Sequence, residues 1–255
     1  MTLFEFPLNE RTRRLLRIEE IYKKFEFQLK NSHDYFEFSC FNTLFEIVQL
    51  VSRSDIKIDF LQELERQEKK HLALTLTEGL KEGKLDPTKV ISKIKIARKK
   101  LESMDVKPGF NFNNNLFLEQ IKKRITAPGG LLNVDFPNFN DWVCYNSKKY
   151  KLESFKIWAQ PLIVFKETSA IILSILRNQY VTELIKLKSD KYQKSINPLK
   201  TFDLIMIQIP TNLRIIPEIS ANKYTVNFFF YHFNKNLEKE PTKLNFKFSY
   251  ALASL

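Results

Sequence analysis

The order in which hydrophobic periodicities follow one another most constrains the fold of this chain. Phe4 and Phe6 occupy alternate positions, which predicts a short strand over residues 3–7. From Asn9 onward the apolar spacing changes to three and four, which predicts a helix over residues 9–30. Helical patterns continue to about residue 124, and strand-like patterns interrupted by one long helix occupy the rest. This order predicts an α+β fold, in which an N-terminal helical domain packs with a mainly antiparallel β domain that also contains a long helix.

The texture of the sequence changes at residues 127–130, where Pro and Gly interrupt the helical pattern. We therefore expect a mainly helical domain over residues 1–126 and a β-strand domain over residues 127–255. The strand at residues 3–7 is expected to join the sheet of the second domain, so the two domains are not cleanly separable in sequence.

Capping residues and apolar stripes predict where the remaining elements begin and end. Asn9 and Asp86 are suitable N-cap residues. The further helices expected in the first domain cover residues 35–51, 56–82, 86–101 and 114–124. In the second domain we expect a strand at 131–136, an extended piece beginning at Trp142 and Val143, a helix over 154–188, a polar connection at 189–200, and strands at 204–209, 224–231 and 243–250. The last two strands are expected to form an antiparallel pair, and Pro161 is expected in the first turns of the long helix or at a kink.

Composition restricts the classes of partner and compartment. The 255 residues carry a formal net charge of +12, which favours acidic partners: an acidic peptide, a nucleic acid or an anionic membrane. The N-terminus lacks a signal-peptide pattern, and no uncharged run approaches the length of about 18 residues needed to span a bilayer. The two cysteines, Cys40 and Cys144, have no metal-ligand spacing. We therefore expect a cytosolic protein with reduced thiols and no membrane insertion.

The sequence contains no motif that indicates catalysis. The histidines His33, His71 and His232 share no ligand spacing, so no metal is expected. Gly129 and Gly130 precede a predicted strand instead of a helix, which favours a tight turn over a phosphate-binding loop. Carboxylates are numerous, but none forms a recognisable catalytic pair. We expect no cofactor and no enzymatic activity; an enzyme of unknown chemistry is a further alternative.

Basic residues carry the strongest functional signal. Arg13 and Arg17 are four residues apart, so they project from one face of the first helix, at the predicted junction of the helical and sheet layers. A second basic segment, residues 93–100, would lie on one amphipathic helix. Such a helix can contact nucleic acid phosphates, but it lacks interleaved aromatic residues, so a solvated face is favoured. A basic nucleic-acid-binding protein is the alternative function.

Four stretches carry a resemblance to a known family. They are Phe4–Glu19 (FEFPLNERTRRLLRIE), Leu61–Gln67 (LQELERQ), Arg124–Gly130 (RITAPGG) followed by Asp135–Pro137 (DFP), and Ile216–Ser220 (IPEIS). These stretches occur in the family's order along essentially the whole chain. On them the sequence resembles the ZapD family of bacterial division proteins, which associate with the tubulin-like protein FtsZ.

The resemblance implies a non-enzymatic homodimer that acts in the cytoplasm at the mid-cell division site. It implies that a cationic pocket binds the C-terminal tail of FtsZ, and that two such pockets per dimer cross-link filaments into bundles and stabilise the Z-ring. Neither nucleic acid binding nor a cofactor is implied. The residues expected at this pocket are Arg13, Arg17, Arg124, Asn140, Arg214 and Lys223. Trp142 or nearby Phe residues are candidates for its apolar walls, although a core position is more usual for a tryptophan. Two positions where the family tends to be basic are occupied here by Thr225 and Phe229, and Asn140 stands where the family can carry a histidine.

Overall fold

The computed structural model describes residues 1–52, 55–77, 86–104, 112, 114–126, 136–178, 182–187, 189–242 and 245–254. Contacts between Cα atoms divide the described chain into two compact units. The β unit contains residues 1–14 and 173–254, and the helical unit contains residues 15–77 and 86–172. These limits differ from the boundary between residues 126 and 127 expected from the sequence. They fall within two helices, because the first and last helices each run from one unit into the other.

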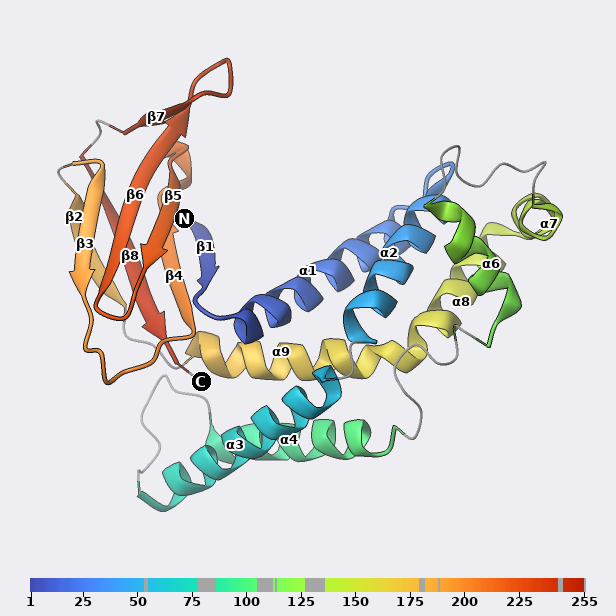
Figure 1. The fold of residues 1–255 in the computed structure, drawn as a ribbon, viewed down its shortest axis with the longest axis horizontal. Coiled ribbons are helices and arrows are strands. Elements are labelled where there is room, and N and C mark those ends of the chain that lie inside the picture. The colour runs from blue at the N-terminus through green and yellow to red at the C-terminus, as the bar shows by residue number, and fades with distance from the viewer. Residues whose placement is uncertain are drawn as a thin grey trace. The chain divides into compact units, whose positions relative to one another are not determined.

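The α+β fold class expected from the sequence is confirmed (Figure 1). The helical elements are α1 (Glu10–Lys30), α2 (Phe36–Val51), α3 (Ile56–Thr77), α4 (Pro87–Glu102), α6 (Leu116–Ile125), α7 (Pro137–Tyr145), α8 (Lys148–Ala159), the 3-10 turn η1 (Gln160–Leu162) and α9 (Ile163–Asn178). The strands are β1 (Thr2–Pro7), β2 (Glu183–Leu187), β3 (Lys191–Ser195), β4 (Leu204–Ile209), β5 (Ile216–Ala221), β6 (Thr225–Phe233), β7 (Lys239–Pro241) and β8 (Phe246–Ala253), with a 3-10 turn η2 (Thr211–Leu213) between β4 and β5.

Two expected N-caps are confirmed. The Asn9 Oδ1 atom accepts a hydrogen bond from the backbone N–H of Thr12 at 2.8 Å, and its amide donates to the Asp203 carboxylate at 2.6 Å. The first bond satisfies one of the free N–H groups at the start of α1. The Asp86 carboxylate caps α4 in the same way, accepting from the N–H of Thr88 at 3.0 Å, with Pro87 in the first turn.

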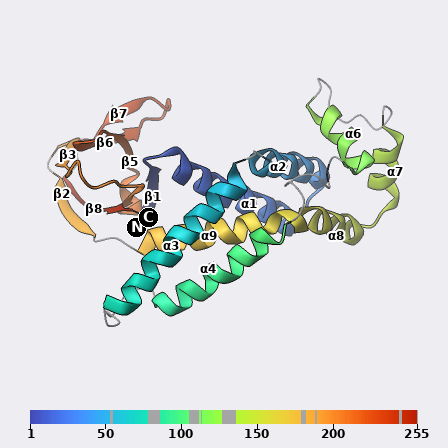
Figure 2. The same cartoon turned by 60° about the horizontal axis from the view of Figure 1, so that its bottom comes forward.

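The helical unit is built around an aromatic cluster centred on Phe41 of α2, which is fully buried. The ring of Phe41 lies 4.7 Å from that of Phe155, 5.5 Å from Trp142 and 5.6 Å from Trp158. These rings come from α2, α7 and α8, so edge-to-face and tilted contacts hold three helices together. In Figure 2, α3 and α4 lie side by side as an antiparallel pair, and α4 turns its apolar stripe, Val90, Ile91, Ile94, Ala97 and Leu101, inward.

The β unit contains two antiparallel sheets, with strand orders β1-β4-β8-β2 and β3-β6-β5, and β7 pairs with β6. One hydrophobic core takes residues from both sheets; the rings of Phe230 in β6 and Phe248 in β8 are 4.8 Å apart. The expected addition of the first strand to the C-terminal sheet is confirmed, because β1 pairs with β4 from Thr2 opposite Ile209 to Pro7 opposite Leu204. The continuous apolar run Leu204–Ile207 predicts a strand that is buried on both faces. This is confirmed, since Ile205 and Met206, which point to opposite faces of β4, are both buried.

Four expectations about the second half of the chain are wrong. Residues 142–143 belong to α7 instead of an extended piece, because Phe139 and Trp142 place one helical face in the aromatic cluster. The long helix ends at Asn178, and residues 183–187 form strand β2. The polar connection at 189–200 contains strand β3, and the last two long strands, β6 and β8, lie in different sheets. The strand expected at 131–136 lies outside the described residues except for Phe136, which directly precedes α7.

Pro161 lies in the 3-10 turn that joins α8 to α9, where its missing N–H breaks the α-helical pattern. The helical run from Lys148 to Asn178 has 31 residues and is long and apolar enough to cross a membrane by length and composition. In this run, 50% of the most apolar stretch of 18 residues is buried inside the structure. A buried core helix meets the same criterion of length and composition.

Candidate functional site

Helix α1 presents the two arginines that the sequence singled out. Both side chains are exposed, and they lie one helical turn apart. The Arg13 side chain is 49% exposed, and its Nη1 atom lies 3.2 Å from the Glu10 carboxylate. An ion pair this exposed holds a guanidinium only weakly. A competing carboxylate could therefore replace Glu10 as the partner of Arg13.

Arg17 lines an open groove of about 400 Å³ between α1 and α2. Ile21 on α1 and Leu50 on α2 supply its apolar surface. On the rim, the Lys24 ammonium lies 3.7 Å from the Glu46 carboxylate. The groove thus combines an apolar floor with cations and carboxylates on its edges, which suits an extended or helical peptide that carries both kinds of side chain.

Arg124 and Asn140 lie on neighbouring helices of the helical unit. Arg124 is exposed in the last turn of α6, and its guanidinium carbon lies 5.3 Å from the centroid of the Phe136 ring. Asn140, in α7, accepts a hydrogen bond from the Cys144 thiol at 3.1 Å. Trp142 is buried in the aromatic cluster with 8% exposure. It is therefore part of the core, and it offers little surface as a wall for a ligand.

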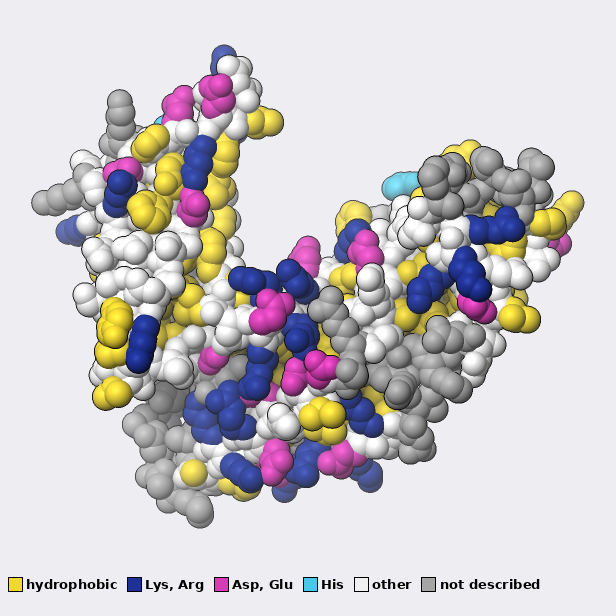
Figure 3. Space-filling view, viewed as in Figure 1, with side chains coloured by type: hydrophobic (Ala, Val, Ile, Leu, Met, Phe, Trp, Pro, Cys, Tyr) yellow, Lys and Arg dark blue, Asp and Glu magenta, His cyan; other side chains and the backbone are white. Residues whose placement is uncertain are grey.

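On the β unit, the outward face of the β3-β6-β5 sheet holds a cation that the sequence analysis missed. Thr225 and Phe229 both point to this face of β6, and Lys191 is the residue opposite Phe229 in β3. The Lys191 Nζ atom lies 5.8 Å from the Phe229 ring centroid. Because the sequence predicts a polar connection at residues 189–200, only the pairing of β3 with β6 shows that Lys191 lies beside Phe229. Figure 3 shows hydrophobic and charged side chains side by side on the surface of the β unit.

The same face carries a second pair of a lysine and an aromatic ring. The Lys239 Nζ atom lies 3.8 Å from the centroid of the Tyr231 ring, and it also forms an ion pair with Glu218. Hydrogen bonding to Glu218 raises the pKa of Lys239. Lysine therefore stays charged on this face over the whole physiological range of pH.

Lys223 and Arg214 do not meet. Lys223 is exposed in the turn between β5 and β6, and Arg214 directly follows the turn η2, before β5 begins. A six-residue strand separates them, a span of about 20 Å at the usual rise per residue. The two residues therefore belong to different surfaces of the β unit.

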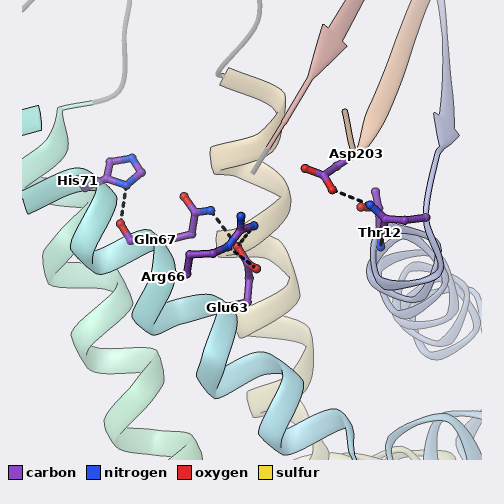
Figure 4. A network of polar contacts seen from close by, with 7 residues as sticks. Thr12, Glu63, Arg66, Gln67, His71 and Asp203 are labelled. Carbon is purple, nitrogen blue, oxygen red and sulfur yellow. Dashed lines mark hydrogen bonds and ion pairs between the residues drawn. The ribbon is translucent and has the colours of Figure 1, made fainter. Parts of the chain in front are cut away.

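The Leu61–Gln67 stretch, one of the four family-like segments, forms a buried polar row on α3 (Figure 4). Glu63 is 1% exposed and lies 2.9 Å from the Arg66 guanidinium, and Gln67 donates to Glu63 at 2.8 Å. His71 continues the row, with its Nδ1 atom 2.8 Å from the carbonyl oxygen of Gln67. Figure 4 also shows Asp203 beside Thr12 at the start of α1. Glu63, Gln67 and His71 are all buried, so these polar side chains lie on the packed face of α3.

The basic face of α4 is partly neutralised by carboxylates. Arg98 lies 2.8 Å from Glu102 and 3.3 Å from Glu68, and Lys100 lies 2.7 Å from Glu167. Such pairing lowers the positive potential that a polyanion would meet, so it favours the solvated-face interpretation of residues 93–100.

The two cysteines differ in exposure, since Cys40 is buried and Cys144 is exposed. Burial, together with the nearby Glu37 charge, raises the pKa of the Cys40 thiol to about 12. Among the described residues, no group of three or more His, Cys, Asp and Glu side chains could hold a metal ion.

Comparison with known proteins identifies the chain as a cell division protein. Residues 16–228 match the model of a family described as "ZapD: Cell division protein". The chain is 31% identical over 255 residues to "Cell division protein ZapD" of Ralstonia pickettii (strain 12J), covering 100% of both chains. The chain therefore belongs to the ZapD family, which consists of non-enzymatic cell division proteins.

Proposed function

We propose that this protein binds the C-terminal tail of FtsZ and, as a homodimer, cross-links FtsZ filaments into bundles that stabilise the Z-ring at mid-cell in the cytoplasm. Family membership supports the role in division. The observation that carries the binding proposal is the pair Arg13 and Arg17, exposed one turn apart on α1, with Arg17 beside an apolar groove. An acidic peptide with hydrophobic anchors needs this combination of guanidinium groups and apolar surface.

Further exposed cations lie beside aromatic rings and would contribute to the same kind of recognition. Arg124 lies over Phe136 in the helical unit, and Lys191 lies beside Phe229 in the β unit. In this protein, Lys191 provides a positive charge next to a position where the family tends to be basic. A lysine held against a ring presents its charge with fewer accessible rotamers, which lowers the entropy cost of binding a carboxylate.

A twofold dimer would duplicate every tail-binding surface. Filaments display many tails, so two weak sites on one rigid particle would gain avidity without any new contact. The net charge of +12 should accelerate encounter with acidic tails and make bundling sensitive to salt.

The test is co-sedimentation with FtsZ filaments at two salt concentrations, with tail-less FtsZ as the negative control. Arg13→Glu and Arg17→Glu are expected to abolish bundling, because each replaces a cation with a carboxylate that repels the tail. Lys23→Glu is the matched control, since Lys23 is an exposed α1 cation that does not line the groove. Circular dichroism of each variant checks the fold. Bundling by Arg13→Glu and Arg17→Glu at the wild-type level would show that α1 is not the tail-binding element.

The nucleic-acid alternative predicts a different outcome. The protein would then shift a nucleic acid in a gel at physiological salt but would co-sediment only weakly with FtsZ filaments. Reversing the charges of Lys93 and Lys99 on α4 would weaken nucleic acid binding by a similar factor for every nucleic acid sequence. Retention of the gel shift by that double variant would exclude α4 as a phosphate-binding helix.

A further inference from the structure

A second open hollow, of about 700 Å³, lies in the β unit and was not anticipated as a site of its own. It is lined by the segment that follows η2, by the end of β6 and by β7. Arg214 and His232 contribute its nitrogen-bearing side chains, Glu240 contributes a carboxylate, and Phe233 and Pro241 contribute apolar surface. We refer to it as the Arg214 hollow.

Arg214 has an unusual backbone conformation. Its φ of 51° and ψ of 33° place it in the left-handed region, which a side chain with a Cβ atom disfavours. Its N–H donates to the carbonyl of Thr211, so the residue closes the turn η2. A strained non-glycine residue that lines a hollow is typical of functional positions. A glycine would adopt this backbone conformation with less strain. The presence of arginine therefore points to a role for its side chain.

Glu240 has polar partners inside the hollow, whereas Arg214 has no carboxylate partner among the described residues there. The His232 Nε2 atom lies 3.2 Å from one Glu240 oxygen, and the Asn234 amide donates to the other at 2.9 Å. Both oxygens of Glu240 are therefore occupied within the β6–β7 hairpin. Within the described part of the chain, no carboxylate forms an ion pair with Arg214, so its guanidinium can form a bidentate pair with an external carboxylate.

Apolar side chains also line the hollow. Phe233 is 49% exposed although it ends a strand of a folded sheet, and Ile215, directly after Arg214, is 3% exposed and forms part of the core. A side chain seated against Phe233 would remove apolar surface from water. The hollow thus has both a guanidinium group, which can bind a carboxylate, and an exposed aromatic ring, which can contact a hydrophobic side chain, among its lining residues.

We propose that the Arg214 hollow binds a peptide segment in which a carboxylate neighbours a hydrophobic side chain. It is a recognition site separate from the α1 groove, because all of its lining residues belong to the β unit, whereas the groove lies in the helical unit. The proposed function enters this inference only in identifying which natural protein would supply the peptide. The binding of such a peptide to the hollow does not depend on it.

The test uses the full-length protein and a short fluorescein-labelled synthetic peptide of alternating leucine and aspartate, titrated by fluorescence anisotropy. Arg214→Gly removes the guanidinium and suits the left-handed backbone. We expect it to weaken binding by about tenfold or more, the effect of losing a charge-assisted hydrogen bond, while the thermal midpoint stays at or above that of the wild type. Phe233→Ala should also weaken binding of the acidic peptide. A second peptide, in which asparagine replaces each aspartate, should bind the wild type no better than the acidic peptide binds Arg214→Gly.

Lys235→Gly is the matched control, because it removes one positive charge from the exposed end of the same hairpin without touching the hollow. Equal binding by Arg214→Gly and the wild type, or an equal loss for Lys235→Gly, would overturn the proposal. The FtsZ experiment separates the two hypotheses. If the wild type bundles filaments but Arg214→Gly binds the probe normally, only the hollow is wrong. If Arg214→Gly loses the probe while the wild type never bundles filaments, only the proposed function is wrong.

Discussion

Lys151 forms a buried ion pair with Glu37, and its removal offers a direct test of what stabilises the helical unit. The Lys151 and Glu37 side chains are 11% and 8% exposed and join α8 to α2. The Lys151 Nζ atom also donates to the carbonyl oxygen of Val143 in α7 at 3.2 Å and lies 5.8 Å from the Phe36 ring centroid. One ammonium group therefore connects three helices.

Lys151→Met should lower the free energy of unfolding by about 3–5 kcal/mol, because it leaves the Glu37 carboxylate buried without its partner. This corresponds to a fall in Tm of about 6–20 °C for a chain of this size. The double variant Lys151→Met with Glu37→Leu should recover most of the loss, since no unpaired charge then remains in the interior.

Urea unfolding followed by tryptophan fluorescence measures this effect. Both tryptophans of the chain, Trp142 and Trp158, lie in the aromatic cluster of the helical unit, so the signal reports on that unit. Lys156→Met is the matched control on the same helix: Lys156 lies 2.6 Å from Glu153, but the two side chains are 59% and 52% exposed. The control should cost less than about 1 kcal/mol. Equal losses for Lys151→Met and Lys156→Met would refute the argument that burial sets the strength of the pair.

Two further predictions concern the β unit. The Arg177 guanidinium donates to both carboxylate oxygens of Glu5 at 2.7 Å. Arg177→Ala should therefore destabilise β1 by about 1.5–3 kcal/mol. Faster hydrogen exchange of the β1 amides, with the other strands unchanged, would confirm this prediction. The pKa of Glu183 is lowered by hydrogen bonds from Lys194 and then from Tyr250; stabilisation is therefore present above its ordinary value of 4.5 and lost as pH falls through the lower folded value. Glu183→Gln should reduce the loss of stability that occurs as pH falls below 4.5, and it should cost under about 1 kcal/mol at neutral pH, because the side chain is 46% exposed. Acid unfolding that is the same in Glu183→Gln and the wild type would exclude this carboxylate as a cause of the pH dependence.

Local signals in the sequence predicted local structure well. Asn9 and Asp86 indicated where α1 and α4 begin, because a capping side chain acts within its own helical turn. The continuous apolar run of β4 predicted burial on both faces, since a strand covered on both sides has no polar face to show. The α+β class followed from the order of such signals.

Signals that depend on distant partners were predicted less well. Periodicity could not show that β6 and β8 lie in different sheets, because a strand's alternation reports which face is buried and not which strand lies beside it. The apolar pattern near Leu184 continued that of α9, so strand β2 was mistaken for helix. The sequence left Trp142 either in the core, the usual place of a large aromatic residue, or at a wall of the ligand site, and its packing against Phe41 assigns it to the core.

By itself, the sequence determined the family, the positions of most helices and the exposed arginines of α1, because motifs, caps and helical spacing are all written within short stretches of chain. Only the tertiary structure placed Lys191 beside Phe229 and separated Arg214 from Lys223 by the length of β5. These arrangements depend on strand register and turn geometry, which bring residues distant in sequence together or keep near ones apart. Proximity between charges is a property of the fold, and a count of basic residues cannot supply it.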